Sequence, residues 1–312
     1  MTLNSLYLFI RGRMAKMEQC KICGGSDLRI EYNGIIRDGG LGKYTPKPVK
    51  MYRCNQCKVI CHETMMDLDE YYTSKEYRMS LEGTITENDF YNLHDKESID
   101  KLLYTGMVYR NKVVADIGCG CGAFMDLVSG LCREVIAVEP TRAYRDILSR
   151  KGYRTYCYAK DALKDYKESV DVVVSFDVIE HVESPLDFIK DVYDLLKKGG
   201  EAYIGTPTET PVMRKLLGEC YERKLLFSTQ HLWVFGEDSL MKIAEASGFV
   251  NANTSVKYFQ RYGISNVLGW LKYQEPGKKV DNEMISDAMD MAWRRGIEEQ
   301  GLSDYIVLRL IK

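Results

Sequence analysis

The sequence predicts an α/β fold in which a mostly parallel sheet carries helices on both faces, with a small cysteine-rich domain before it. Three observations support this fold class. A β-branched run, VDVVVSF, is followed by an amphipathic stretch and then by a second strand-like run, EAYIGTP. The stretch from Val113 to Phe124, VVADIGCGCGAF, gives a buried strand, an acid, a glycine-rich turn and a helix start in that order. Two Cys-x-x-Cys pairs lie near the N-terminus.

Residues 1–16 are expected to form a flexible tail. Their apolar patch precedes the basic residues and no small-residue cleavage site follows, so the segment does not have the pattern of a signal peptide. No apolar run in the chain approaches the ~20 residues needed to span a bilayer. Ten cysteines without a secretion signal predict a reducing, cytoplasmic location rather than a disulfide framework.

Residues 17–65, called here the cysteine-rich domain, are predicted to form a zinc ribbon. The β-prone segments LRIEY and VKMYR lie between its two knuckles, Cys20-Lys-Ile-Cys23 and Cys54-Asn-Gln-Cys57. This spacing suits four thiolates around one zinc at ~2.3 Å, and such a closed site is structural because no position is left for a substrate. The alternatives are four unligated thiols or a redox pair. Cys61 and His62 are interpreted as bystanders rather than as a second site.

Charge changes along the chain. Residues 1–65 carry 11 Lys and Arg against 5 Asp and Glu, whereas residues 66–105 carry 4 against 10. A basic domain suits RNA, a phosphorylated metabolite, or the acidic segment that follows it. Residues 66–105 are predicted to form a helical connector or lid, in which Tyr71, Tyr72 and Tyr77 either close over a ligand or pack in the core.

The glycine-rich turn predicts a cofactor site, and its acid selects the cofactor. Gly118, Gly120 and Ala123 satisfy the GxGxxG/A pattern of dinucleotide-binding folds. A dinucleotide would place an anionic pyrophosphate over the turn, where Asp116 would repel it, whereas S-adenosylmethionine (SAM) brings a cationic amino group and a sulfonium. Asp116 therefore favours SAM. Glu139, which closes the next strand, suits the ribose hydroxyls of either cofactor.

Several motifs, taken in order, resemble those of class I SAM-dependent methyltransferases. They are DIGCGCG, the acid Glu139, the pair Asp161-Ala162, SFDVIEHV and LLKKGGEAYIGTP. The resemblance covers roughly Gly106 to Phe249 and is closest to the branch that includes the ubiquinone-biosynthesis O-methyltransferases and many sugar and surface-polysaccharide enzymes. It implies a Rossmann-like methyltransferase domain over residues 106–312, with SAM as the cofactor.

The same resemblance implies cofactor roles for individual residues. The methionine end of SAM would be held by Asp116, Gly118, Gly120 and Gly122, the ribose by Glu139, and the adenine by Asp161 with Ala162. Phe176, at the end of VDVVVSF, would lie beside the cofactor or in the ordinary core.

Few residues are candidates for the catalytic base. Histidine is the side chain that ordinarily titrates near neutral pH, and the chain has only four histidines. His181 lies beside Glu180, and in the quinone-methylating relatives the corresponding positions help bind a divalent metal. The sequence leaves open whether this pair binds a metal, acts as a base or caps the following helix. His231, within STQHLWVFGEDS, either takes the proton of the acceptor or packs against the helix that follows.

The last strand is predicted in DYIVLRLIK, so residues 259–302 form an insertion in the sheet. Within it, Arg261, Tyr262, Asn266 and Trp270 combine a cation, aromatic faces and an amide. This mixture suits a sugar or an anionic acceptor, and it suits the contact of a homodimer equally well.

The function predicted is methyl transfer from SAM to a small-molecule acceptor, with a hydroxyl of a sugar, nucleotide sugar or glycan precursor as the preferred class. One alternative is an RNA methyltransferase that uses the basic zinc ribbon. The net charge of −2 and the lack of a basic stripe with interleaved aromatics disfavour nucleic acid. The other alternative is a non-catalytic SAM-binding or zinc-ribbon interaction module, which the intact acid and glycine set disfavours.

Overall fold

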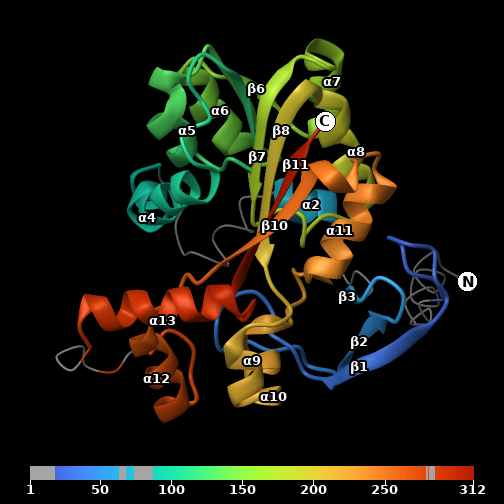
Figure 1. Ribbon diagram of the computed structural model, residues 1–312, viewed down its shortest axis with the longest axis vertical. Helices are drawn as coiled ribbons and strands as arrows, with labels where there is room; N and C mark the ends of the chain where they lie inside the picture. Colours follow the sequence, from blue (N-terminus) through green and yellow to red (C-terminus); the bar gives the residue numbers. More distant parts are fainter. Residues whose placement is uncertain (1–17, 63–67, 74–86, 279, 281–284) are drawn as a thin grey trace, which may run out of the picture.

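The computed structural model describes residues 18–62, 68–73, 87–278, 280 and 285–312, and within them it contains two sheets (Figure 1). The larger has seven strands in the order β10-β11-β8-β7-β4-β5-β6. Its strands are β4 Val113–Ile117, β5 Glu134–Val138, β6 Arg154–Tyr156, β7 Val170–Phe176, β8 Leu196–Pro207, β10 Thr254–Phe259 and β11 Tyr305–Ile311. Strands β4 to β8 pair in parallel, whereas β11 pairs antiparallel with both β8 and β10.

Helices cover both faces of this sheet, as the sequence predicts. In Figure 1 the sheet is seen nearly edge-on, with α4, α5 and α6 on one side and α7, α8 and α11 on the other. Their bounds are α4 Glu87–Thr105, α5 Ala123–Val128, α6 Arg142–Arg150, α7 Ala159–Tyr166, α8 Pro185–Leu195 and α11 Glu237–Ala246. Helix α2, Leu68–Thr73, belongs to the predicted connector. In the part of the chain that the structure describes, none of the helices is both long and apolar enough to cross a membrane.

The strands form where the sequence is apolar without alternation. Every residue of β4 and β7 is buried, because helices pack on both sides of a parallel sheet. Helix α8 begins with Ser184 as its N-cap, which accepts from the Asp187 N–H, and with Pro185 in its first turn. The Gly199-Gly200 pair of the sequence predicts the end of the amphipathic helix after VDVVVSF, and this position is wrong. The helix ends at Leu195 because Leu196 is already extended and pairs with Val170, and the glycines lie where the pairing of β8 with β7 shifts.

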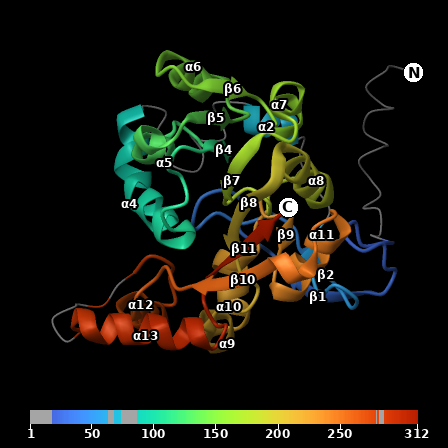
Figure 2. The ribbon, with the colours of Figure 1, turned by 45° about the horizontal axis from the view of Figure 1, so that its top comes forward.

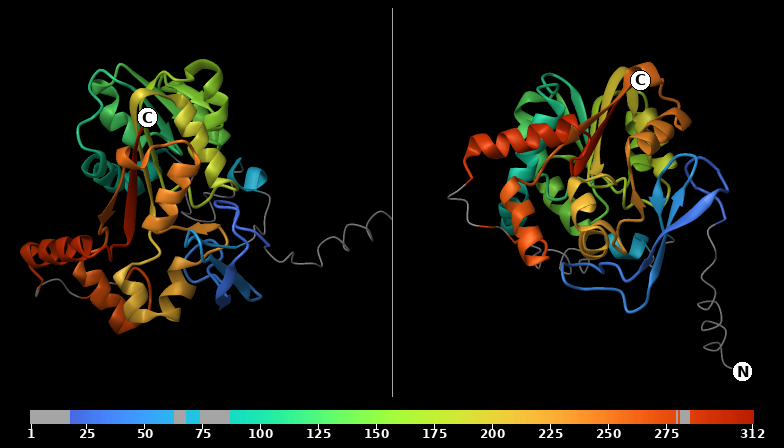
Figure 3. Two further views of the ribbon diagram at one scale, coloured as in Figure 1. Left: turned by 45° about the vertical axis from the view of Figure 1, so that its right-hand side comes forward. Right: turned by 60° about the horizontal axis from the view of Figure 1, so that its bottom comes forward.

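The insertion predicted between the last two strands is present as two helices. They are α12 Ile264–Tyr273 and α13 Asp287–Glu299, and they lie between β10 and β11 in the chain. Helices α9 Val212–Leu217 and α10 Glu219–Tyr221 follow β8. Figure 3 shows these helices at the end of the molecule where the parallel strands finish, which is the end that carries the cysteine-rich domain.

The smaller sheet belongs only in part to the cysteine-rich domain. Its order is β1-β2-β3-β9, with bounds β1 Leu28–Gly34, β2 Val49–Cys54, β3 Ile60–Cys61 and β9 Trp233–Val234. The two β-prone segments between the knuckles thus form β1 and β2, as predicted. The fourth strand comes from the methyltransferase part of the chain, and Figure 2 shows it beside the N-terminal strands.

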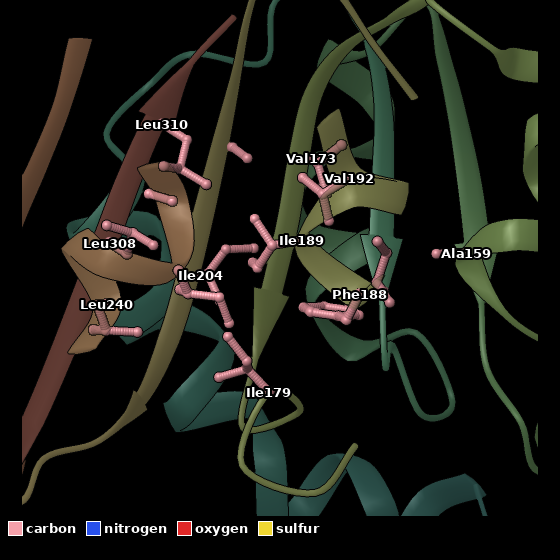
Figure 4. Close-up of a cluster of buried hydrophobic side chains, with 14 of the residues drawn as sticks. Ala159, Val173, Ile179, Phe188, Ile189, Val192, Ile204, Leu240, Leu308 and Leu310 are labelled. Atoms are coloured by element: carbon pink, nitrogen blue, oxygen red, sulfur yellow. The ribbon is translucent and has the colours of Figure 1, made fainter. Parts of the chain in front are cut away.

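The core is continuous between the two sheets. One apolar cluster fills the space between the large sheet and α8 and α11, with Ile189, Val192, Ile204 and Leu308 at its centre (Figure 4). The same cluster extends to Val59 of the cysteine-rich domain. A second cluster joins Met51 of β2 to Phe227 and to Trp270 of α12. Apolar contact therefore ties the two parts of the molecule together.

Candidate active site

A cavity of about 560 Å³ opens at the carboxyl ends of β4, β5 and β7, the position where ligands bind in open α/β sheets. Its lining comes from the ends of those strands, from α2, from the start of α7 and from α8. The residues are Leu68, Tyr72, Ile117, Gly118, Val138, Glu139, Pro140, Cys157, Tyr158, Ala159, Lys160, Asp177, Val178, His181, Val182, Glu183, Ser184, Asp187, Phe188 and Asp191. Of the residues that the sequence assigns to the cofactor or to catalysis, Gly118, Glu139 and His181 lie on this lining.

The glycine turn joins β4 to α5 in a backbone shape that other residues rarely adopt. Gly118, Gly120 and Gly122 have φ of 81°, 56° and 89°. A Cβ on Gly118 would collide with Val178, which lines the cavity, and one on Gly120 would collide with the ring of Phe90. The missing Cβ thus lets Val178 pack against the turn at Gly118, and both residues border the cavity.

Asp116 lies directly before this turn, 2% exposed. Its Oδ2 is buried and makes no hydrogen bond within the described residues. Burial raises the pKa of Asp116 to about 6, while Lys101 lowers it and Glu139 raises it. A buried carboxylate with an unused oxygen suits a cationic ligand group, so the residues present fit the amino group and sulfonium of SAM.

Glu139 closes β5 and fixes the turn from the other side. Its Oε2 accepts from the Gly120 N–H at 3.0 Å and its Oε1 accepts from the Thr141 N–H at 2.8 Å. Each carboxylate oxygen keeps a second lone pair, so the residue can still accept from ribose hydroxyls in the cavity that it lines.

The far end of the cavity is formed by Tyr158, Ala159 and Lys160 with Phe188. The two residues assigned to adenine stand just behind them. Asp161 accepts from the Tyr158 N–H at 3.0 Å, and Ala162 is buried in α7. They therefore shape the backbone that borders the cavity. Sequence reasoning missed Phe188, because a helix phenylalanine is indistinguishable from ordinary core without the fold.

Phe176 is 4% exposed, packs in a core cluster, and is absent from the cavity lining. A cation from α4 lies next to it: Lys101 Nζ is 5.5 Å from the centre of the Phe176 ring and 6.0 Å from that of Phe124. The same lysine acts on the pKa of Asp116. Lys101 thus belongs to the polar surroundings of the cofactor turn, and no motif in the sequence marked it.

Glu180, His181 and His231 come together although 49 or more residues separate the last from the other two. Their nitrogen and oxygen ligand atoms lie within 4.8 Å of one another. His181 Nε2 is 3.9 Å from Glu180 Oε1, and the two imidazole centres are 4.9 Å apart. Neither Glu180 oxygen makes a hydrogen bond within the described residues. This cluster adjoins the cavity through His181.

The surroundings of the cluster set its protonation. Burial, followed by Asp177, raises the pKa of Glu180 to about 8. Burial and the neighbouring His181, Arg37 and Arg261 lower the pKa of His231, which keeps that imidazole neutral at neutral pH. His181 Nδ1 lies 2.9 Å from the Gln230 carbonyl oxygen, which can only accept, so this contact requires a proton on Nδ1. The Nε2 of a neutral His181 is then the acceptor that faces Glu180.

Two tyrosines of the predicted lid reach the same cluster. Tyr72 lines the cavity and its hydroxyl lies 2.9 Å from His181 Nδ1, while Tyr71 accepts from the Gln230 side-chain amide. Tyr77 falls outside the described residues. Helix α2 is anchored on the cofactor side as well, since Thr141 donates to the Tyr72 carbonyl at 3.0 Å.

The insertion residues divide into two groups. Arg261 lies 4.0 Å from the centre of the Tyr305 ring and 3.4 Å from Asp177 Oδ1, at the edge of the cavity. Asp177 has a positive φ of 56°, an uncommon conformation for a residue other than glycine. In contrast, Asn266 and Trp270 are buried, 6% and 2% exposed, and Trp270 packs in the core. Their grouping with Arg261 in an acceptor pocket is therefore wrong, because the amphipathic face of α12 turns them inward.

The four knuckle cysteines also come together. Cys20 Sγ lies 3.6 Å from Cys57 Sγ, and Cys23 Sγ lies 3.5 Å from Cys54 Sγ. The edge of a tetrahedron with metal–sulfur bonds of 2.3 Å is about 3.8 Å, so this donor set fits a zinc ion. Cys61 and His62 are buried outside the cluster.

Comparison with known proteins identifies the family of the chain. A sequence model described as a methyltransferase domain matches residues 95–254, more than half of the chain. A probable S-adenosylmethionine-dependent methyltransferase of Mycolicibacterium smegmatis is 26% identical over 239 residues, which cover 74% of this chain and 82% of that protein. The mitochondrial ubiquinone biosynthesis O-methyltransferase of Rattus norvegicus is 27% identical over 107 residues, and the match spans only 31% of each chain.

A solved structure supports the fold alone. A chain from the complex of the Haloferax volcanii Trm112 methyltransferase activator with a methyltransferase superposes with a TM-score of 0.51 at 12% identity, covering 80% of this chain and 99% of that one. The family match covers the strand ends, Gly118 and His181, which border the cavity, and Glu180 beside them. The chain belongs to the methyltransferase-domain family and is a SAM-dependent methyltransferase.

Proposed function

We propose that the chain transfers the methyl group of SAM to a hydroxyl of a small molecule, and that the acceptor is a sugar, nucleotide sugar or glycan precursor. The observation that carries this proposal is the cluster of Glu180, His181 and His231 beside the cofactor cavity. A hydroxyl is a poor nucleophile until a base takes its proton, and this cluster supplies a base where the acceptor must stand.

SAM supplies an electrophilic methyl group whose sulfonium charge is lost as the methyl is transferred. The chain's part is to hold the acceptor oxygen in line with that methyl and to remove its proton. We assign proton removal to the neutral imidazole of His231. His181 is fixed by the Gln230 carbonyl, and the Glu180 carboxyl lies within 4.8 Å of His231, where its oxygens could accept from the imidazolium that forms.

Polar groups at the cavity edge support a hydroxyl-rich acceptor. Asp177 accepts from the Tyr305 hydroxyl at 3.2 Å and lies beside the Arg261 guanidinium. The Asp177 carboxylate, which lines the cavity, and the guanidinium beside it can pair with several hydroxyls, whereas Tyr305 is buried and fixes Asp177. The RNA alternative receives no comparable support, since Arg53 of the basic domain is already paired with Glu31 at 2.9 Å and with Glu209 at 2.5 Å.

Replacing His231 by alanine tests this assignment. With sugar nucleotides as acceptors and labelled SAM as donor, His231→Ala should lower kcat by about 10²- to 10⁴-fold, while the Kd for SAM stays within about twofold of the original. His94→Ala is the matched control, because it removes an imidazole from α4 outside the cluster. Unchanged kcat in His231→Ala would show that His231 is not the catalytic base.

A divalent cation is a second candidate for the same cluster, because three ligand-type groups converge there and both Glu180 oxygens are unused within the described residues. Held by Glu180, His181 and His231, the ion would lower the pKa of an acceptor hydroxyl. Dialysis against a chelator followed by addition of Mg²⁺ distinguishes the two. Activity that disappears and returns supports the cation, and activity that persists supports His231 alone.

We also propose that the four knuckle cysteines bind one structural zinc ion. The support is their mutual spacing and the knuckle backbone, in which the Gly24 N–H donates to the Cys20 carbonyl and the Lys58 N–H donates to the Cys54 carbonyl. Four thiolates leave no open coordination position, so the metal would stabilise the domain and take no part in methyl transfer.

A further inference from the structure

The cysteine-rich domain and the methyltransferase domain share a sheet at the segment that carries His231. Strand β3 pairs antiparallel with β9, with Ile60 opposite Val234 and Cys61 opposite Trp233. The pairing continues for one more residue, because the His62 N–H donates to the Leu232 carbonyl at 3.2 Å. The residue after His231 is therefore held by the N-terminal domain.

The side chain of His62 extends this connection to the other side of His231. It is 3% exposed, and its Nε2 lies 3.1 Å from the Ser228 carbonyl oxygen, to which it donates. The Ser228 hydroxyl in turn accepts from the His231 N–H at 3.1 Å. Ser228 thus links the buried imidazole of the cysteine-rich domain to the backbone of the candidate base.

The start of the same segment is fixed by a second piece of the cysteine-rich domain. The Arg37 N–H donates to the Phe227 carbonyl at 3.2 Å, and the Thr229 N–H donates to the Arg37 carbonyl at 3.0 Å. The Thr229 hydroxyl also donates to Asp38 at 2.8 Å. Residues 227–234 consequently lie along the N-terminal domain over their whole length.

The opposite side of the segment fixes the rest of the cluster. The Gln230 carbonyl meets His181 Nδ1 at 2.9 Å, and the Trp233 N–H donates to the Glu180 carbonyl at 3.2 Å. The Trp233 indole donates to the Val182 carbonyl at 2.8 Å. Movement of the segment would therefore displace both imidazoles at once.

We propose that the cysteine-rich domain positions the catalytic cluster, and that His62 is a positioning residue for His231. The effect of His62 on catalysis rests on the function proposed above, in which His231 is the base. The domain is then a structural part of the active centre rather than a separate module that grips an acceptor. Proton transfer needs heavy atoms within about 3 Å, so a small shift of the segment lowers turnover without altering the SAM cavity.

Hydrogen–deuterium exchange on the full chain tests the positioning itself, with no acceptor required. In His62→Ala the amides of residues 228–233 should exchange at least about tenfold faster than in the original protein, while those of β4 and β7 keep their rates. His62→Gln, whose amide can still donate to the Ser228 carbonyl, should restore most of the protection. Arg29→Gln, an exposed change on β1, is the matched control and should alter neither region.

Turnover with the labelled-SAM assay then tests the consequence. His62→Ala should lower kcat by about tenfold with an unchanged Kd for SAM, and His62→Gln should recover it in part. Unchanged exchange in His62→Ala overturns the proposal, and so does faster exchange with unchanged kcat. If His62→Ala does not fold, Ser228→Ala, which removes the acceptor of the His231 N–H, is read in the same way. Failure of the proposed base itself shows separately, as full activity in His231→Ala.

Discussion

Asp116, which the sequence assigns to the cofactor, is buried beside the glycine turn, and its environment disfavours the charged form. It is fully buried, one of its oxygens makes no hydrogen bond within the described residues, and burial raises its pKa to about 6. The ordinary pKa of an aspartate is about 3.9. Between these two pH values the folded protein holds a proton that the unfolded chain has released. The free energy of unfolding therefore falls as pH rises through this window, and the full loss is present at neutral pH.

Asp116→Asn removes that charge at almost constant shape. At neutral pH the ligand-free variant should be more stable than the original by on the order of 1–3 kcal/mol, because no carboxylate remains to be desolvated. Its affinity for SAM should fall at least about tenfold, since a charge-assisted contact is lost. Thermal unfolding and calorimetry measure the two effects. A less stable variant with unchanged SAM affinity would instead show that Asp116 has a purely structural role.

The pH dependence of SAM binding has the opposite sign to that of stability. A cationic ligand prefers ionised Asp116, so binding must displace a proton wherever the pH lies below about 6. Affinity should weaken as pH falls through 6, by at most about tenfold per pH unit, and should level off above it. Calorimetry on both sides of pH 6 checks this, with Asp116→Asn as the control that should lose the dependence. A flat profile in the original protein would contradict the assignment.

At the residue scale, the sequence identified groups that carry their own chemical signal. Asp116 lies near the end of β4, Glu139 follows β5, and four cysteines have metal spacing, so all six could be named in advance. That Glu180, His181 and His231 meet could not be predicted, because it depends on how residues 227–234 fold against residues 180–182, which follow β7. Lys101 and Phe188 were missed because lysine on a helix and phenylalanine in a core are too common to mark a site.

At the scale of elements, the turn between β4 and α5 borders the cavity through Gly118. Its glycines differ from other positive-φ glycines in what surrounds them. A Cβ on Gly118 would meet Val178 at the cavity wall, whereas a Cβ on Gly106, whose φ is 70°, would meet nothing within 4 Å. The two positions share the backbone strain and differ in the steric contact.

Gly118→Ala and Gly106→Ala form a matched pair. Both should lose roughly 1–2 kcal/mol of stability, the cost of a left-handed conformation for a residue with a Cβ, and Gly118→Ala should lose more because its Cβ also strikes Val178. Only Gly118→Ala should also weaken SAM binding, by at least about tenfold, because Val178 must shift where the ligand lies. Denaturant unfolding and calorimetry separate these effects. Equal SAM affinity in the two variants would count against a cofactor position over Gly118.

Element types were predictable where a period or a fully apolar run was long enough. Strands β4, β5, β7 and β11 and helix α8 follow directly from such patterns. Strands β3 and β9 have two residues each; β3 is defined by its pairing with β2 and β9, and β9 by its pairing with β3 across the two parts of the chain. Tertiary pairing of this kind leaves no periodic signal in the sequence.

At the scale of the whole molecule, the cysteine-rich domain is joined to the rest by apolar packing and by ion pairs. Arg53 and Arg214, one from each part of the chain, both contact Glu31 Oε1 at 2.9 Å. Although burial opposes it, these two guanidinium groups lower the pKa of Glu31 to about 2. The excess of basic residues in the N-terminal domain suggests RNA, a phosphorylated metabolite or the acidic connector as its partner. The described contacts also include ion pairs between Glu31 and the two arginines.

Removing one knuckle thiol should therefore disturb more than the N-terminal domain. Cys54→Ser is expected to reduce zinc from one equivalent per chain to near none and to lower the melting temperature, since metal binding contributes to folding of such domains. Cys220→Ser, a half-buried thiol far from the knuckles in sequence, should keep both. Metal analysis of the purified proteins and thermal unfolding provide the comparison. Full zinc in Cys54→Ser would exclude the four-cysteine site.

The position of the transferred methyl group tests the central claim most directly. The protein would be incubated with SAM carrying a ¹³C-methyl group and a panel of sugar nucleotides, with RNA as a parallel substrate, and the product examined by NMR. We expect the label on a sugar oxygen, with none in the RNA. Label on nitrogen or carbon, or transfer into RNA, would contradict the account of a hydroxyl acceptor activated beside the cofactor cavity.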